Sequence, residues 1–278
     1  MPRVYLSGNP VHDRVLRAFA EGCKGELVEG WNYEPSDVAV IFGVYKSKVK
    51  ISWPRGEIFR RQRENKKDVI VLETGYINRG DGENHHYAAG FNGLNGRADF
   101  RNKDMPDHRA MKLRRDFGMR CLAWRESGKH ILLCGQVPWD ASVDHIHYEM
   151  WLYDIARQLQ GYTKRPIRFR PHPLANIPSP KGCKPTEHVS IFDDFEDCWA
   201  VVTFNSNSGV EALMHGIPVV ALDAGAMYYH LAEHWVSKVD SPYTPNNEER
   251  AQWLNNLAFC QWTLDEMSNG EAWQHLSR

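Results

Sequence analysis

Short apolar runs rich in β-branched residues alternate along this chain with longer stretches of helical periodicity, and this alternation limits the fold more than any other feature. Strands are expected at residues 4–7, 37–42, 68–73, 130–134, 167–170, 199–204 and 218–222. Helices are expected at residues 11–21, 56–64, 144–160, 208–215 and 227–234. Regular alternation of strand and helix is typical of βα units, so the sequence predicts an α/β fold built on parallel sheets.

The length of 278 residues is enough for two domains. A polar break at residues 125–129 precedes a new apolar run, and it predicts a boundary between residues 1–127 and residues 128–278, each half being doubly wound. Residues 74–124 are rich in Gly, Asn, Arg and His and show little periodicity before Arg109. A loop of this length in a compact protein is usually functional.

Composition excludes several classes of protein. Apolar residues make up 42% of the chain and charged residues 25%, and the apolar runs are far shorter than the roughly 20 residues that span a bilayer. The N-terminus has no apolar signal segment, and the six cysteines show no CxxC spacing. We therefore expect a cytoplasmic protein with free thiols and no membrane contact.

Charge is divided unevenly along the chain. Residues 1–130 carry 24 Lys and Arg against 17 Asp and Glu, whereas the remainder carries 10 against 18. The basic residues concentrate at residues 44–67 and 97–120. Such runs are most often solvated surface. The alternative is that the first half meets a polyanion, which clustered Lys and Arg attract whatever its sequence.

The strongest local signal is residues 203–226, TFNSNSGVEALMHGIPVVALDAGA. An apolar run leads into a small polar turn, Asn205-Ser206-Asn207-Ser208-Gly209, and then into a short helix. At the carboxyl end of a parallel strand, such a turn brings hydroxyls, amides and backbone N–H groups to one place, which suits a phosphate. The alternative is that Ser and Asn only cap the helix.

Three other segments place polar groups at expected strand ends. In RPIRFRPHPL, residues 165–174, prolines on both sides restrain His172, which could donate to a phosphate or take a proton. In ILLCGQVPWDASV, residues 131–143, Gln136 follows a strand. Asp140 and Ser142 then open a helix, and the alternative is that one of them only serves as its N-cap. In VIVLETGYINRGDGENHH, residues 69–86, Glu73 ends a strand, where it could act as a general base or simply pair with Arg79.

Together, the segments GQVPWDAS, RFRPHP, FNSNSGVEALMHGIPVV and LETGYINR resemble the motifs of the Kdo transferases of capsular polysaccharide synthesis, and related motifs occur in bacterial sialyltransferases. The resemblance covers the second half well and the first half at residues 69–79. It implies an α/β, GT-B-like fold with two Rossmann-like domains, a cleft between them, and a C-terminal helix pair that crosses back to close them. It also implies a glycosyltransferase without an obligatory metal, whose nucleotide-sugar donor, a UDP- or CMP-sugar, is held mainly by the C-terminal domain.

The resemblance also implies roles for individual residues. The residues expected to bind the donor are Gln136, Ser142, Arg170, His172, Pro173, Asn205, Ser206, Asn207, Ser208 and Glu211. Of these, His172 would stabilise the leaving phosphate. Glu73 falls in the acidic motif, but Thr74 stands where the family commonly has a second acid, so Asp81 and Glu83 remain alternatives to Glu73 as the base.

The acceptor is inferred from charge rather than from a motif. Aromatic residues interleaved with Arg, Lys and Asn in the long loop are typical of a nucleic-acid face, and FNGLNGRADFRNK could enter a duplex and hold an extruded base. The residues expected to contact DNA are Arg79, Asn92, Asn95, Arg97, Arg101 and Lys103. The main hypothesis is a bacteriophage-type enzyme that transfers a sugar to 5-hydroxymethylcytosine in double-stranded DNA, by one inverting displacement with Glu73 as base.

Two alternatives to this function remain open. The first is a capsule or surface-polysaccharide glycosyltransferase of Kdo-transferase type, which would have no affinity for DNA. The second is a non-catalytic protein that binds a nucleotide sugar or nucleic acid, as Thr74 in place of an acid would allow. The sequence His145-x-His147-x-Glu149 is a weak metal signal without further ligands, so no metal site is expected.

Overall fold

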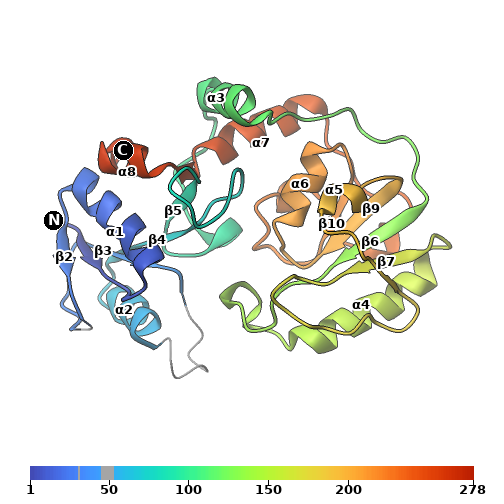
Figure 1. Cartoon of the computed structure of the whole chain (residues 1–278), viewed down its shortest axis with the longest axis horizontal. Helices are drawn as coiled ribbons and strands as arrows, with labels where there is room; N and C mark the ends of the chain where they lie inside the picture. The colour runs from blue at the N-terminus through green and yellow to red at the C-terminus, as the bar shows by residue number, and fades with distance from the viewer. Residues whose placement is uncertain (31, 45–52) are drawn as a thin grey trace. The chain divides into compact units, whose positions relative to one another are not determined.

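The computed structural model describes residues 1–30, 32–44 and 53–278, and the chain forms two compact units (Figure 1). The first unit comprises Met1–Lys112 together with Leu254–Arg278, and the second comprises Leu113–Trp253. The division therefore differs from the predicted boundary at residue 127. The polar break at residues 125–129 lies inside the second unit, because the preceding segment is bound to it: Leu122 and Arg125 donate backbone hydrogen bonds of 2.8 Å to the carbonyls of Met214 and Gly216.

The sheet of the first unit has the strand order β11-β5-β4-β3-β1-β2. Its parallel strands are β1 (Arg3–Tyr5), β2 (Glu26–Val28), β3 (Val38–Phe42) and β4 (Asp68–Thr74). Two antiparallel strands extend it, β5 (Tyr87–Phe91) and β11 (Gln261–Trp262). The strands β2, β5 and β11 were not predicted from the sequence. The strand β5 lies within the segment expected to be a long irregular loop, because YAAGF has none of the β-branched residues that mark a strand.

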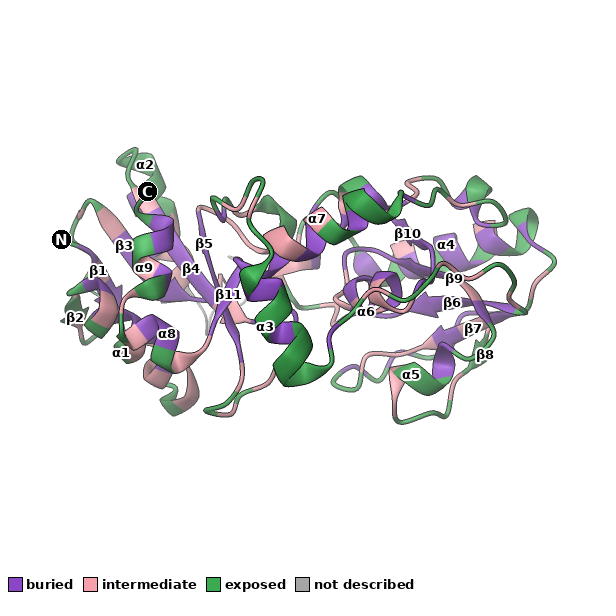
Figure 2. Cartoon of the chain, turned by 90° about the horizontal axis from the view of Figure 1, so that it is seen from above, coloured by how far each residue is buried: buried purple, intermediate pink, exposed green. Residues whose placement is uncertain are grey.

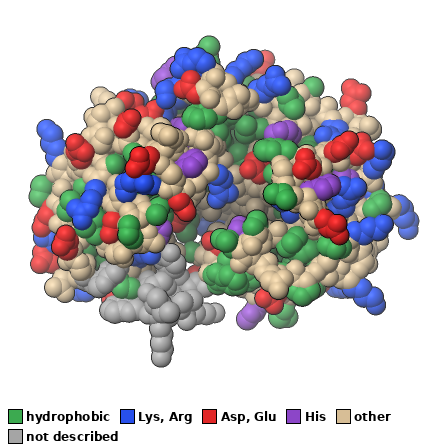
Figure 3. All heavy atoms as spheres, viewed as in Figure 1, with side chains coloured by type: hydrophobic (Ala, Val, Ile, Leu, Met, Phe, Trp, Pro, Cys, Tyr) green, Lys and Arg blue, Asp and Glu red, His purple; other side chains and the backbone are tan. Residues whose placement is uncertain are grey.

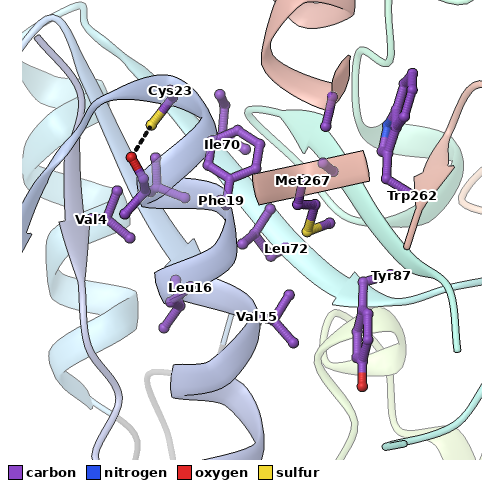
Figure 4. Close-up of a cluster of buried hydrophobic side chains, with 14 of the residues drawn as sticks. Val4, Val15, Leu16, Phe19, Cys23, Ile70, Leu72, Tyr87, Trp262 and Met267 are labelled. Carbon is purple, nitrogen blue, oxygen red and sulfur yellow. Dashed lines mark hydrogen bonds between the residues drawn. The ribbon is translucent and has the colours of Figure 1, made fainter. Parts of the chain in front are cut away.

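Helices cover both faces of this sheet. On one face lie α1 (Pro10–Cys23), α8 (Leu264–Ser268) and α9 (Glu271–Leu276), whose apolar side chains pack with alternate residues of the strands (Figure 4). The helix α1 is well bounded: the Asn9 side chain accepts hydrogen bonds from the first turn, Pro10 occupies N1, and Lys24 ends the helix in the left-handed conformation. On the other face, Ile58 of α2 (Trp53–Glu64) packs with Tyr5, Ala39 and Val71.

The C-terminal segment is an integral part of the first unit. Phe19 of α1 and Met267 of α8 share one core cluster with Trp262 of β11 (Figure 4). The backbones approach so closely that a Cβ on Gly22 would lie 1.9 Å from the carbonyl oxygen of Met267. Only glycine fits at this position of α1.

The sheet of the second unit is parallel throughout, with the order β10-β9-β6-β7-β8. Its strands are β6 (His130–Cys134), β7 (Ile167–Arg170), β8 (Lys184–Pro185), β9 (Cys198–Thr203) and β10 (Val219–Ala221). From β6 the chain winds outward through β7 to β8, and then returns to the other side of β6 through β9 to β10. The order therefore reverses between β6 and β9, and in doubly wound sheets ligands bind outside the carboxyl ends of the strands at such a switch point.

Helices α4 (Tyr148–Tyr162) and α6 (Ser208–Met214) flank this sheet, and the short α5 (Ile191–Asp194) precedes β9. Alternate residues of the strands, among them Ile131, Leu133 and Val202, pack against Leu152 and Leu159 of α4. Figure 2 shows β6, β9 and β10 largely buried, whereas both residues of the edge strand β8 are exposed. The expected strand pattern of this half is confirmed, except that β8 was missed. The expected helix at residues 227–234 is wrong: only a 3₁₀ turn forms there, at Tyr229–Leu231.

The chain passes between the units within α3 (His108–Phe117) and α7 (Asn247–Ala258). The expected onset of periodicity at Arg109 agrees with α3, which is largely exposed in Figure 2. Within the described ranges, no helix is both long and apolar enough to cross a bilayer.

Candidate functional site

Polar side chains gather at the switch point of the second sheet. Gln136 follows β6 by two residues, Asn205 follows β9 by two residues, and Asp223 follows β10 by two residues. All three are at most 9% exposed. Because β10, β9 and β6 are adjacent and parallel, their carboxyl ends lie at one edge of the sheet. The sequence predicted Gln136 and Asn205 at this edge but not Asp223.

Gln136 and Asn205 bind each other. The Gln136 side chain donates to Asn205 Oδ1 at 2.7 Å and accepts from the Asn205 backbone N–H at 2.9 Å. Asn205 Nδ2 donates to the carbonyl of Ser142 at 3.0 Å and to Asp223 Oδ1 at 2.8 Å, which uses both of its protons. The backbone N–H of Gln136 donates to the hydroxyl of Tyr148 at 2.8 Å. These two amides therefore hold the strand ends in position.

His145 completes this network. Its Nε2 donates to Asp223 Oδ2 at 3.2 Å, while Asp223 Oδ1 also accepts from the backbone N–H of Gly225 at 2.9 Å. The His145 side chain is 43% exposed and that of Asp223 only 8%. From the sequence, His145 was only part of a weak metal signal, and no role was predicted for it. Since 78 residues separate it from Asp223, no local pattern could have indicated the pair.

The turn after β9 is stabilised largely from within. The hydroxyl of Ser206 accepts from the backbone N–H of Ser208 at 3.3 Å, and the backbone N–H of Ser206 donates to the Thr203 hydroxyl at 3.1 Å. The Tyr228 hydroxyl donates to the Ser206 carbonyl at 2.7 Å. The helix that follows, α6, is only seven residues long. These contacts position the turn, but the N-cap residue Asn207 makes no side-chain capping hydrogen bond, so the capping alternative is not borne out. The geometry of this helix start does not by itself define a phosphate site.

The Cys134 thiol lies next to Ser208 at the end of β6. Burial raises the pKa of this thiol to about 12, although the neighbouring Ser208 side chain opposes the shift. A thiol with this pKa stays protonated at neutral pH, so Cys134 is a packing residue and not a nucleophile.

His172 lies in the turn that follows β7. The backbone N–H of Leu174 donates to His172 Nδ1 at 3.1 Å, so the proton of the neutral ring lies on Nε2. Its ring is partly exposed, and Pro173 is exposed. The Nδ1 contact therefore fixes the tautomer of the neutral imidazole.

Arg170 has a different position from the one expected of a donor ligand. Its guanidinium donates to the carbonyls of His188 and Val189 at 2.9 and 2.7 Å, and it forms an ion pair with Asp194, whose side chain is fully buried. Asp194 also accepts from His188 Nδ1 at 2.9 Å. Arg170 thus fixes the segment before α5, and its donors are engaged within the protein.

Glu73 is half-buried near the carboxyl end of β4, where it is paired in register with Ala88 of β5. The alternatives Asp81 and Glu83 lie in the exposed turn between these strands, and Arg14 contacts both: it donates to the Asp81 carbonyl and lies 3.5 Å from the Glu83 carboxylate.

Two of the residues expected to contact DNA make contacts within the first unit. Asn92 accepts from the backbone N–H of Val69 and donates to Asp68, both at 2.9 Å, which joins the ends of β4 and β5. The Arg101 guanidinium lies 4.7 Å from the ring centroid of Phe91 and donates to the carbonyl of Arg278. The amide of Asn95 accepts from the Tyr76 hydroxyl at 3.5 Å. Arg79, Arg97 and Lys103 are exposed.

No single basic surface is apparent on the face drawn in Figure 3, where the described Lys and Arg side chains are interspersed with Asp and Glu. The basic window at residues 44–67 lies partly outside the described residues, which omit 45–52. Across the rest of the described chain, no group of three or more His, Cys, Asp and Glu is placed to hold a metal ion.

A pocket of about 430 Å³ lies at the opposite, amino end of β6 and β7. Its charged lining is balanced, with Lys129, Arg168 and Lys184 against Asp193, Glu196 and Asp197. It contains none of the predicted site residues, and its balanced charge gives no preference for a phosphate. We therefore place the candidate site at the switch point.

Comparison with solved structures identifies the fold. The chain is similar to the KpsC β-Kdo 2,4-transferase of Thermosulfurimonas dismutans, with a TM-score of 0.61 and 16% identity over 94% of this chain and 90% of that one. It is similar to the KpsC β-Kdo 2,7-transferase of the same organism, with a TM-score of 0.61 and 15% identity over 98% and 99%. No protein-family model and no curated protein matches the sequence. The expected α/β fold with two Rossmann-like domains is confirmed.

Proposed function

We propose that the protein is a glycosyltransferase of Kdo-transferase type, which moves a sugar from a nucleotide-sugar donor to a hydroxyl of a saccharide. The observation that carries the proposal is the match in fold to two Kdo transferases over at least 90% of each chain. The hydrogen-bonded polar groups at the switch point of the second sheet support it, because this is where sheets of this topology bind nucleotides.

The donor binds to the second unit in this proposal. The hydrogen bonds between Gln136 and Asn205 fix the spacing between the ends of β6 and β9. The residues around this pair contact the donor. These are Ser142, His172, Pro173, Ser206, Asn207, Ser208 and Glu211. His172 Nε2–H stabilises the phosphate oxygen on which negative charge develops. The nucleotide is cytidine or uridine, and no metal takes part.

The acceptor is a saccharide in this proposal, in place of the DNA base favoured from the sequence. Asn92 and Arg101, two of the residues expected to contact DNA, both make contacts within the first unit, which supports this choice. Glu73 takes the proton of the acceptor hydroxyl as that oxygen bonds to the anomeric carbon. A single displacement inverts the anomeric centre, which nuclear magnetic resonance of the product would report.

The proposal is tested by incubating the protein with CMP-Kdo and with a panel of UDP-sugars, and by measuring nucleotide release. Two acceptors are compared, a Kdo-terminated oligosaccharide and duplex DNA that contains 5-hydroxymethylcytosine. We expect one nucleotide sugar to be consumed and its sugar mass to appear on the oligosaccharide. Mass gain on DNA would restore the original acceptor, and no turnover of any donor would contradict the proposal.

A paired substitution strengthens this test. Replacing His172 with Ala is expected to slow donor turnover by about 10- to 100-fold, because a hydrogen bond to a charged group contributes roughly 1.5–3 kcal/mol. Leu174 is the matched control, since it lies two residues away and is 76% exposed. Leu174→Ala should leave turnover unchanged.

A further inference from the structure

We propose that His145 is a catalytic residue of the second unit, which transfers a proton from Nδ1 to the phosphate oxygen of the leaving nucleotide, and that Asp223 is its positioning residue. The inference rests on the proposed function, because it assigns a role within the same donor site. It concerns two residues that the resemblance to Kdo transferases does not assign.

The pair lies at the sheet edge where a donor would bind. Asp223 follows β10, and His145 lies between the 3₁₀ turn Ala141–Val143 and α4, in the connection that leaves β6. The same Asp223 carboxylate that contacts His145 also accepts from Asn205, which is bound to Gln136. His145 is thus tied through hydrogen bonds to the ends of all three strands at the switch point.

The surroundings of Asp223 make it a firm anchor. Its carboxylate is buried and accepts from the side chain of Asn205, from the backbone of Gly225 and from His145. A buried carboxylate with several donors has a fixed orientation, and so does an imidazole that donates to it. Carboxylate–imidazole pairs of this kind fix the tautomer of a catalytic histidine and stabilise its charged form.

The opposite nitrogen of His145 is the one available for chemistry. Nε2 is directed to Asp223, and among the described residues Nδ1 has no hydrogen-bond partner. The ring packs against Phe204 at a centroid distance of 5.5 Å, which restricts its rotation, and the side chain is 43% exposed. A histidine that is held on one side and open on the other differs from one buried for packing.

In its protonated form, His145 donates Nε2–H to Asp223 and Nδ1–H to the phosphate oxygen that is bound to the anomeric carbon. The bond between that carbon and that oxygen breaks, its electron pair stays on the oxygen, and the Nδ1 proton moves to the oxygen. The acceptor oxygen bonds to the anomeric carbon and loses its proton to the general base. Asp223 remains ionised throughout.

His147 offers a matched control from the same segment. It lies two residues from His145, is exposed, and precedes α4 without a side-chain capping hydrogen bond. Nothing in the sequence favours one of these two histidines over the other. Only His145 contacts a buried carboxylate.

The experiment measures kcat and KM for donor turnover in the full chain, for the wild type and for His145→Gln, His145→Ala, Asp223→Asn and His147→Gln. We expect His145→Gln to lower kcat by about 10²–10⁴-fold with KM for the donor changed less than about threefold. His147→Gln should match the wild type. Added imidazole should restore part of the kcat of His145→Ala but none of that of Asp223→Asn, in which the original ring is still present but no longer held by a carboxylate.

The outcomes separate the two proposals. If the wild type turns over no nucleotide sugar, the proposed function fails and this inference fails with it. If the wild type is active and His145→Gln keeps its kcat within about twofold, the proposed function stands and the catalytic role is overturned. A rise in KM alone, without rescue by imidazole, would mean that His145 only binds the donor and would also overturn it. Thermal unfolding of each variant checks that it folds, and His145→Gln decides the question if Asp223→Asn does not.

Discussion

Individual residues at the switch point show how closely the second unit is packed there. Gly209 lies in the first turn of α6, where a Cβ would lie 2.0 Å from Cζ of the buried Tyr228 ring. The ring cannot move away freely, because its hydroxyl donates to the Ser206 carbonyl. Any larger residue at position 209 must therefore displace Tyr228 or α6.

We predict that Gly209→Ala destabilises the protein by about 1–3 kcal/mol, since an extra methyl group in a packed core forces backbone and side chains apart. The measurement is urea unfolding followed by circular dichroism. Gly161→Ala is the control, because Gly161 lies in α4 with no atom near its Cβ direction, and alanine there should be neutral or stabilising by up to about 1 kcal/mol. Equal stability of the two variants would contradict the predicted clash.

The candidate site was predictable only in part. Gln136, His172 and Asn205 each follow a strand whose apolar pattern is clear, so their place at one sheet edge follows from the sequence. What they contact does not follow, because hydrogen bonds such as that between Gln136 and Asn205 join residues 69 positions apart. For the same reason the sequence assigned Arg170 to the donor, whereas a buried carboxylate on α5 binds it.

At the scale of elements, long apolar runs were predicted well and short strands poorly. The runs at β4, β6 and β9 contain four or more apolar residues and were placed within one or two residues. The strands β8 and β11 have two residues each, which is too short to show any alternation. They exist because a neighbouring strand offers unpaired backbone groups, which is a property of the sheet and not of the segment.

The attachment of α3 to α8 depends on a buried ion pair. Arg109 of α3 donates to both carboxylate oxygens of Glu266 at 3.0–3.1 Å, and it lies 4.0 Å from the centroid of the Trp262 ring. Burial alone would raise the pKa of Glu266, but the hydrogen bonds and charge of Arg109 outweigh it and lower that pKa below 4.5. The ionised form is therefore the one that the folded protein favours.

We predict that Glu266→Gln destabilises the protein by roughly 3 kcal/mol at neutral pH, because it leaves the Arg109 charge buried without a partner. A carboxylate with a lowered pKa stabilises the fold at a pH above its ordinary value, and that contribution is lost as pH falls through the lowered pKa. The difference between wild type and variant should therefore shrink below pH 4.5. Unfolding free energies measured from pH 7 to pH 3 test this.

Glu271 provides the control for this prediction. Its carboxylate lies 4.0 Å from Arg109 but is 51% exposed, so solvent screens the interaction. Glu271→Gln should cost less than about 1 kcal/mol at any pH in the series. A cost equal to that of Glu266→Gln would contradict the assignment of the stability to the buried pair.

At the scale of the whole molecule, the second unit has its own core. Its main apolar cluster draws only on residues between Ile131 and Val239, which are all within the range Leu113–Trp253. The first unit, in contrast, shares its core between the two ends of the chain, since Phe19 packs with Met267. The two units therefore differ in what each needs in order to fold.

We predict that a fragment of residues 113–253 folds with a cooperative thermal transition, whereas a fragment of residues 1–112 does not. Without residues 254–278, the face of α1 that bears Val15 and Phe19 is exposed and the edge of β5 is unpaired. Circular dichroism and limited proteolysis measure both. Adding a peptide of residues 254–278 to the first fragment should restore protection, and protection without the peptide would contradict the prediction.

The return of residues 254–278 to the first unit also sets an order of events on the ribosome. Residues 113–253 must be translated before the last helices of the first unit exist, which takes roughly 7–30 s at about 5–20 residues per second. During that interval the apolar face of α1 in the first 112 residues is exposed to solvent, while the second unit can already fold. The N-terminal part of the chain is thus translated first, but its folding is completed last. The exposed face of α1 is therefore the expected target of a chaperone during synthesis.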